Sequence, residues 1–123
     1  MTKRVDKKFK ERLALKRDRL KCATACSVAA TILKFSPEAI NHGYCFEFAT
    51  IVFDLVEGSK IAGHNIKGVG HCWVEYKNLC FDAEVPQGVR GWLNLPFWQR
   101  LKAEAGAKEF TKELQRMGLC LKK

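Results

Sequence analysis

Cys45, His71 and Asp82 follow one another along the middle of the chain, and their side chains can together carry out nucleophilic chemistry. A thiol attacks as its thiolate, an imidazole acts as the base, and a carboxylate holds that imidazole in one tautomer. Cys45 follows Gly43 at a point where a loop is expected to enter a helix. The free N–H groups and the dipole of a helix N-terminus favour a thiolate and can stabilise an oxyanion. The three residues are therefore candidates for a catalytic triad.

His71 and Asp82 lie on two short segments that are expected to be strands, residues 71–76 and 79–84. Residues 77–78, Lys-Asn, fit the two-residue turn of a β-hairpin. Pairing centred on this turn places Asp82 two residues away from direct opposition to His71, on the same face. Side chains with this diagonal spacing can touch. We therefore expect Asp82 to accept a hydrogen bond from His71 and to fix its tautomer.

Other residues of this hairpin also have expected positions. Trp73 shares the face of the imidazole and is expected to shield the thiolate–imidazolium pair from water. Glu84 shares the face of the triad carboxylate and is its substitute if that carboxylate points away. Two further thiols are expected on the opposite face, buried in the core: Cys72 and Cys80.

The backbone N–H of Cys45 is expected to be one oxyanion donor. A second donor is expected from one of three side chains: Asn41, Tyr44 or Trp73. His42 and His64 lie in segments rich in Gly and Asn, which predicts surface loops, and His42 is also a candidate for lining the cleft.

Each member of the triad also has a structural interpretation. Cysteine is among the most frequently buried residues, so Cys45 taken alone can be an inert core thiol. His71 alone can be a structural histidine, and Asp82 can be the carboxylate of a strand end or turn. The three contexts together favour the catalytic interpretation.

Apolar spacing predicts the helices that position these residues. Residues 4–34 are expected to form one helix with a charged first half and an apolar, buried second half. A short turn at 38–40 and a central buried helix over 45–56 follow. Residues 60–70 predict a short strand or a loop.

The C-terminal third is expected to begin with a turn at residues 85–88. Residues 89–95 predict irregular structure or a short helix, and residues 96–118 predict a C-terminal helix that Gly106 weakens or splits. The expected fold class is therefore α+β, with a central helix packed on a small antiparallel sheet of three or four strands.

The motifs resemble those of the transglutaminase-like, papain-related cysteine peptidase superfamily. The similar segments are 43–49 (Gly-Tyr-Cys-Phe-Glu-Phe-Ala), 71–75 (His-Cys-Trp-Val-Glu) and 81–82 (Phe-Asp). The His-x-Trp-Val-Glu pattern of the second segment is the most specific. Together the motifs cover about a third of the chain, between residues 43 and 84.

This resemblance implies that Cys45 is the nucleophile, that His71 is the base and then the acid, and that Asp82 orients it. The implied reaction is hydrolysis of an amide or peptide bond through an acyl-enzyme. The same superfamily includes thiol acyltransferases, cross-linking enzymes and inactive members, which are the alternatives. No cofactor or metal is implied, and the expected partner is a peptide or protein substrate. The interval between the thiol and the imidazole is short for the family, which suggests a trimmed scaffold.

The expected organisation is a single domain over residues 1–123. Within it, residues 1–34 form a basic N-terminal helix, residues 43–84 form the catalytic core, and residues 96–118 form the C-terminal helix. No segment is long and apolar enough to predict a membrane span. The basic N-terminus lacks the apolar run of a secretory signal, which predicts a cytoplasmic protein. The sequence leaves the oligomeric state open.

The net charge of +9 is concentrated at the two ends. Residues 1–22 hold ten basic and three acidic side chains, and residues 100–123 hold seven basic and three acidic. Residues 23–99 carry a net charge of −2. Basic ends can attract nucleic acid or an acidic protein, or can simply be solvated helix faces. The main alternative function is therefore a non-catalytic binding protein that uses these ends.

The six cysteines do not follow the spacing of a disulfide-stapled scaffold, so reduced thiols are expected. Cys22 and Cys26 are four residues apart on the first helix and share one face. They can be part of a metal site or two buried core thiols. No second pair with zinc-finger spacing follows, which favours the core.

Overall fold

The computed structural model describes residues 3–119, and this part of the chain forms an α+β fold with five α-helices and one four-stranded antiparallel sheet. The α+β class expected from the sequence is confirmed, whereas the papain- or transglutaminase-like core stays a prediction. Residues 1–2 and 120–123 of the expected domain lie outside the described residues. In chain order the elements are α1 (Lys3–Leu33), α2 (Pro37–Asn41), α3 (Cys45–Leu55), β1 (Lys60–Ile66), β2 (Val69–Tyr76), β3 (Leu79–Asp82), β4 (Val85–Val89), the 3-10 helix η1 (Trp92–Asn94), α4 (Pro96–Ala105) and α5 (Ala107–Arg116).

The sheet is a meander in which the strands pair in chain order. The β2–β3 turn has positive φ angles at both central residues, 51° at Lys77 and 65° at Asn78. Two such angles are what a type I′ hairpin turn requires, and asparagine tolerates them. Val74 pairs with Phe81 across this turn. The pairing register expected from the sequence is therefore confirmed.

The expected turn at residues 85–88 is wrong, because the structure forms strand β4 there. β4 is an edge strand that pairs with β3 only. An edge position tolerates Pro86, whose missing N–H would disrupt a central strand. Contacts from elsewhere hold the strand in place: the Arg19 guanidinium donates to the Gln87 carbonyl oxygen at 3.0 Å. Such long-range contacts leave no signal in the local sequence.

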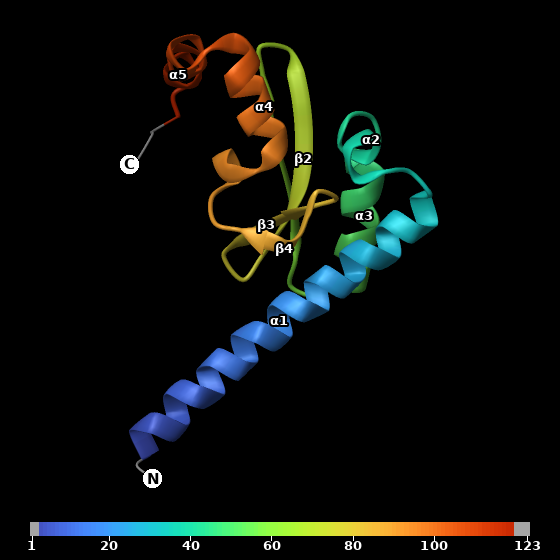
Figure 1. Cartoon of the computed structure of the whole chain (residues 1–123), viewed down its shortest axis with the longest axis vertical. Coiled ribbons are helices and arrows are strands. Elements are labelled where there is room, and N and C mark those ends of the chain that lie inside the picture. Colours follow the sequence, from blue (N-terminus) through green and yellow to red (C-terminus); the bar gives the residue numbers. More distant parts are fainter. Residues whose placement is uncertain (1–2, 120–123) are drawn as a thin grey trace.

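Helices cover both faces of the sheet (Figure 1). α1 and α3 lie on one face, and their apolar side chains form a core with Val74 and Phe81. η1, α4 and α5 lie on the other face and form a second core with Trp73 and Cys80. Gly106, at φ 89°, separates α4 from α5, which confirms the expected split of the C-terminal helix.

α1 is a single long helix whose two halves have different environments. No residue from 6 to 21 is buried, and this part of the helix projects from the domain (Figure 1). Cys22, Ala25, Cys26 and Ala29 are buried against the sheet in the second half. The expected division into an exposed and a buried half is confirmed. Across the described part of the chain, no helix combines the length and apolar character needed to cross a bilayer.

Candidate active site

The thiol of Cys45 lies at the N-terminus of α3, as the sequence predicts. The approach to this helix is fixed locally, because the Tyr44 N–H donates to the Ile40 carbonyl oxygen at 2.7 Å. The Tyr44 ring also stacks on Phe35, with ring centroids 4.4 Å apart. Cys45 is the first residue of α3, where N–H groups lack partners within the helix, so its own N–H is available to a ligand. The thiol is partly exposed.

His71 and Asp82 form the hydrogen bond expected from the hairpin register. His71 Nε2 lies 3.0 Å from Asp82 Oδ2, and the two residues are 3% and 1% exposed. The other carboxylate oxygen, Oδ1, accepts the backbone N–H groups of Glu84 at 2.9 Å and Val85 at 3.2 Å. The carboxylate is therefore held by the turn that follows β3, and it can in turn hold the imidazole.

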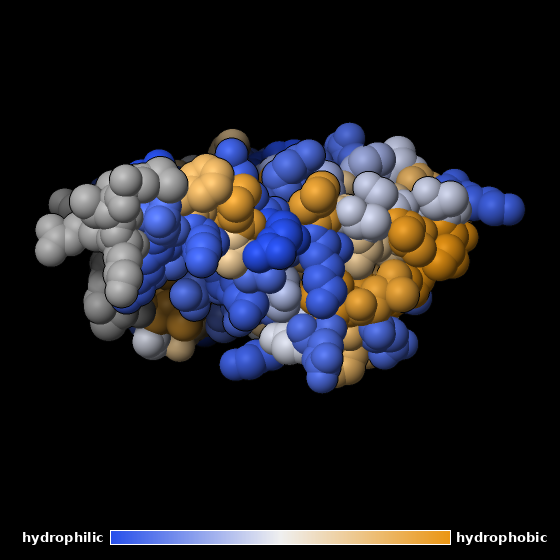
Figure 2. Space-filling view, turned by 90° about the horizontal axis from the view of Figure 1, so that it is seen from below, coloured by the Kyte–Doolittle hydropathy of each residue, from blue (hydrophilic) through white to orange (hydrophobic). Residues whose placement is uncertain are grey.

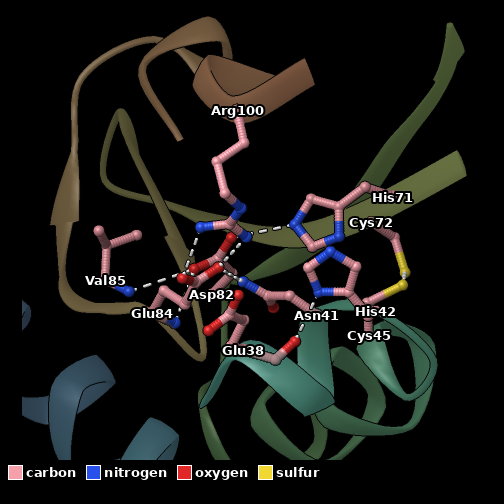
Figure 3. A network of polar contacts seen from close by, with 10 residues as sticks. All are labelled: Glu38, Asn41, His42, Cys45, His71, Cys72, Asp82, Glu84, Val85 and Arg100. Atoms are coloured by element: carbon pink, nitrogen blue, oxygen red, sulfur yellow. Dashed lines mark hydrogen bonds and ion pairs between the residues drawn. The ribbon is translucent and has the colours of Figure 1, made fainter. Parts of the chain in front are cut away.

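The second ring nitrogen of His71 points away from Asp82 and toward the sulfur atoms (Figure 3). Nδ1 is buried and has no hydrogen-bond partner within residues 3–119. With Nε2–H donating to the carboxylate, Nδ1 of the neutral ring carries a lone pair and is the basic atom. Catalytic hydrogen bonds are often long in unliganded sites and tighten when substrate binds. The arrangement thus leaves one basic nitrogen directed at the thiol.

Cys72 lies next to Cys45, which corrects the expectation that it is a core residue. The Cys72 Sγ is 3.4 Å from the Cys45 Sγ, and both side chains are partly exposed. Alternation along β2 does place Cys72 on the face opposite His71, but α3 packs on that face and brings Cys45 there. His71 lies on β2 beyond its pairing with β3, which ends at the pair of Val74 and Phe81.

Cys80 is buried in the core, as expected, but on the other face. It packs in the same core as Trp73, on the α4 side of the sheet. Residues 80 and 82 alternate with 81 along β3, so Cys80 shares the face of Asp82. Its expected position on the opposite face was wrong.

The surroundings favour a thiolate at Cys45 and a charged imidazole at His71. The S–H of Cys72 and, next, the imidazole of His71 lower the pKa of Cys45 from 9.0 to about 4, against the opposing effect of burial. Burial disfavours the charged imidazole, but the hydrogen bond with Asp82 and the neighbouring Cys45 outweigh it and raise the pKa of His71 above 6.5. Hydrogen bonding to Cys45 raises the pKa of Cys72, which therefore stays a protonated thiol. These shifts favour the negative charge on Cys45 over Cys72.

Two of the three expected side-chain oxyanion donors, Asn41 and Trp73, donate to other residues. Asn41 donates to Glu84 Oε1 at 2.8 Å, and the Tyr44 ring is stacked on Phe35. Trp73 is 1% exposed and directs its indole N–H toward Glu75 Oε2 at 3.4 Å. The backbone N–H of Cys45 remains as a donor from the sequence-based set.

Glu84 does not substitute for Asp82 but joins a separate network (Figure 3). Its carboxylate binds the Arg100 guanidinium through two hydrogen bonds, at 2.7 and 2.8 Å, and accepts the Asn41 amide. The Arg100 hydrogen bond is the main cause of a lowered pKa at Glu84. The network ties α2, which precedes Cys45, to α4. The sequence offers no spacing that predicts it.

Phe97, rather than Trp73, covers the imidazole. Its ring stacks on His71, with centroids 4.2 Å apart and an interplanar angle of 17°. The Trp73 ring lies farther away, at 6.1 Å, and stacks on Trp92 instead. The sequence places Phe97 at the start of a helix but does not show which face of the sheet that helix covers.

A small cavity of about 170 Å³ opens beside the covered imidazole. His42 lines this cavity, but Cys45 and His71 do not, so the expected place of His42 in the catalytic cleft stays a prediction. His64 lies in β1 rather than in a loop, and its ring packs on Trp92 at 4.3 Å. The cavity is lined by His42, Val69, Phe97, Arg100, Leu101 and Glu104.

Within residues 3–119, no group of three or more His, Cys, Asp and Glu side chains is arranged to hold a metal ion. Cys22 and Cys26 pack in the core between α1 and the sheet.

No protein-family model matches the chain, and searches of curated proteins and of solved structures likewise find no match. The family resemblance of the sequence motifs consequently stays a prediction, and the function is argued from the site.

Proposed function

We propose that this protein is a cysteine hydrolase of the transglutaminase-like, papain-related type that cleaves an amide or peptide bond. One observation carries the proposal: the buried Asp82–His71 hydrogen bond of 3.0 Å leaves the other imidazole nitrogen directed at Cys45. A buried carboxylate, an oriented imidazole and a thiolate at a helix N-terminus together match the requirements of nucleophilic acyl chemistry.

In the first step, the Cys45 thiolate attacks the carbonyl carbon of the substrate. The negative charge moves to the carbonyl oxygen, where the backbone N–H of Cys45 can donate to it. His71 then gives its Nδ1 proton to the leaving amine, and the tetrahedral intermediate collapses to a thioester on Cys45.

In the second step, water attacks the thioester while His71 Nδ1 takes one of its protons. The acid product leaves, and the Cys45 thiolate and the imidazolium are restored. Asp82 stays ionised throughout and stabilises the imidazolium through Nε2. An amine in place of water gives acyl transfer, so the same intermediate also serves the alternative of a thiol acyltransferase.

The substrate must present its carbonyl to the partly exposed Cys45 thiol. A small cavity lies at Phe97, the ring that stacks on the imidazole, and Cys45 does not line it. A cavity of about 170 Å³ holds one side chain rather than a whole ligand. It offers an aromatic wall at Phe97 and charged groups of both signs at Arg100 and Glu104. These features favour a peptide or protein substrate that inserts one side chain.

The test is cleavage of a complex peptide mixture by the full chain, read by mass spectrometry of new peptide ends. The proposal predicts new ends with the wild-type protein and none with Cys45→Ala or His71→Ala. A matched control is Cys80→Ala, which changes a buried thiol outside the site and should leave the pattern unchanged. Identical new ends from wild type and Cys45→Ala would rule the proposal out.

The projecting half of α1 favours a second function, binding of nucleic acid. Between residues 6 and 21 no residue is buried. This segment carries eight Lys or Arg side chains and three acidic ones. In the view from below, hydrophilic side chains cover much of the middle of the surface and apolar ones gather toward the right (Figure 2). Such a basic rod can follow a phosphate backbone without reading its sequence.

Fluorescence anisotropy with a labelled DNA duplex tests this second function. We expect binding that weakens steeply with salt, that survives Cys45→Ala, and that Lys7→Glu, Lys8→Glu and Lys10→Glu together reduce at least about tenfold at low salt. The same affinity in the triple variant would exclude α1 as the binding element.

A further inference from the structure

The thiols of Cys45 and Cys72 are neighbours, and the hydrolytic mechanism uses only Cys45 as a nucleophile. We propose that this pair is a redox modification site, at which a hydroperoxide oxidises Cys45 and Cys72 then closes a reversible Cys45–Cys72 disulfide. The two Sγ atoms already lie 3.4 Å apart, on elements that face one another, α3 and β2. They must approach by roughly 1.4 Å to reach the disulfide bond length.

Accessibility separates this pair from the other described thiols. Cys45 and Cys72 are both partly exposed, so a small peroxide can reach them. Cys22, Cys26 and Cys80 are 0%, 2% and 6% exposed. Cys22 and Cys26 are also neighbours, but they lie inside the core between α1 and the sheet. Oxidation follows thiolate character and exposure. The pKa of Cys22 is also lowered, but Cys22 is buried, whereas Cys45 combines a lowered pKa with exposure.

The chemistry proceeds in two balanced steps. The Cys45 thiolate attacks one oxygen of hydrogen peroxide, the O–O bond breaks, and the products are a sulfenic acid and a hydroxide ion. The hydroxide takes up a proton to become water. Cys72 then attacks the Cys45 sulfur, the S–O bond breaks, and the departing hydroxide takes the Cys72 proton. The two sulfurs lose two electrons in total, and the peroxide gains them.

The environment favours the second step once the first is complete. The Cys72 thiol is kept protonated chiefly by its hydrogen bond to Cys45. A sulfenic acid is neutral, so its formation removes the negative charge that disfavours ionisation of Cys72. Cys72 can then ionise, and its sulfur is already in contact with the Cys45 sulfur that it attacks.

The disulfide has two consequences for the site. It removes the free thiolate, so the hydrolytic reaction stops while the bond exists. It also prevents a second peroxide from converting the sulfenic acid to a sulfinic acid, which thiols do not reverse. A dithiol reductant restores both thiols by exchange. This regulatory meaning rests on the proposed function, whereas formation of the bond does not.

The experiment reads the bond itself by mass spectrometry. The reduced full chain is treated with hydrogen peroxide, alkylated, and digested with trypsin without reduction. Trypsin places Cys45 in peptide 35–60 and Cys72 in peptide 68–77, each with no other cysteine. The remaining cysteines fall in the peptides 22–34, 78–90 and 117–122. The proposal predicts a linked pair of 35–60 and 68–77 that dithiothreitol separates.

Cys72→Ser provides the informative variant, because its hydroxyl retains a donor beside Cys45 but cannot form a disulfide. In this variant we expect dimedone to trap a sulfenic acid at Cys45, and prolonged peroxide to give sulfinic acid there. In the wild type the sulfinic product should be at least about tenfold less abundant at the same peroxide dose. Cys80→Ser is the matched control and should behave as the wild type.

Two results would overturn the proposal: equal sulfinic acid at Cys45 in wild type and Cys72→Ser, or linked peptides that join cysteines other than these two. The outcome is independent of the proposed hydrolase activity, since the linked peptide is measured without any substrate. A disulfide without peptide cleavage would leave a redox pair and remove the hydrolase. Cleavage without a disulfide would do the reverse.

Discussion

His71 Nε2 and Asp82 Oδ2 lie 3.0 Å apart, on neighbouring strands, and both residues are almost completely buried. The bond directs the imidazole and leaves its Nδ1 facing the sulfur atoms (Figure 3). A buried carboxylate whose other oxygen accepts two backbone N–H groups cannot rotate freely. The orientation of His71 is therefore set by the backbone turn after β3, and the predictions below test what that orientation does.

Removing the Asp82 carboxylate should lower the rate of hydrolysis strongly and the free energy of unfolding only moderately. In Asp82→Ala, the buried imidazole of His71 loses its hydrogen-bond partner. We expect the free energy of unfolding to fall by about 1–3 kcal/mol. We expect kcat/KM for a cleaved peptide to fall at least about 100-fold. Asp82→Asn retains the shape of the side chain but removes its charge, so it should lose activity with a smaller change in stability. Steady-state kinetics and urea unfolding measure the two effects.

The S–H of Cys72 should be needed for the acidity of Cys45, because it is the largest contribution to the lowered pKa of that thiol. The thiolate is present above the pKa and is lost as the pH falls through it. In the wild type, alkylation of Cys45 should therefore change little with pH between about 5 and 8, while an ordinary thiol slows roughly tenfold per unit.

Two substitutions of Cys72 distinguish the effect of its S–H donor from the effect of its side-chain volume. In Cys72→Ala the alkylation rate of Cys45 should begin to fall at a higher pH than in the wild type, because the donor is gone. Cys72→Ser keeps a donor and should lie between the two. Identical pH profiles in all three proteins would show that Cys72 does not influence the ionisation of Cys45.

The stacked ring of Phe97 should keep water from the back of the imidazole. Phe97→Ala removes a 7% exposed side chain. It should lower the free energy of unfolding by about 3 kcal/mol. Phe97→Leu retains an apolar cover and should cost less. Hydrolysis per folded molecule should follow the same order, with the alanine variant slowest. Equal activity in both variants would contradict a role for this ring at the site.

The Asn41–Glu84–Arg100 network should contribute to stability more than an exposed ion pair does. Glu84→Gln removes the charge at a half-buried position whose partner Arg100 is about a third exposed. Solvent screening limits the expected loss to about 1 kcal/mol. Lys112→Gln, which breaks the exposed Glu109–Lys112 pair of 3.9 Å, is the control and should leave the melting temperature unchanged. A larger fall in melting temperature in Lys112→Gln than in Glu84→Gln would contradict the stronger contribution of the Glu84 network.

The sequence predicted the parts of the site that depend on local rules. Hairpin register follows from a two-residue turn, so the meeting of His71 and Asp82 could be deduced from their numbers alone. The position of Cys45 at a helix start followed from the glycine before it and the apolar helix after it.

The parts that the sequence did not predict depend on which element packs on which face. Alternation separates Cys72 from His71, but only the docking of α3 shows that Cys72 then meets Cys45. The stacking of Phe97 likewise depends on how α4 rests on the sheet. Strand β4 needs the partner strand β3 and the support of α1. Long-range packing of this kind leaves no periodic signal in one sequence.

If His71 makes Cys45 the reactive nucleophile of this chain, the alkylation rates of the thiols will show it. Limiting iodoacetamide at about pH 6 is followed by tryptic mass spectrometry, which resolves Cys45, Cys72 and Cys80 in separate peptides. We expect Cys45 to be labelled at least about tenfold faster than Cys72, and His71→Ala to reduce this difference. Equal rates for the two thiols in the wild type, or a difference that persists unchanged in His71→Ala, would contradict it.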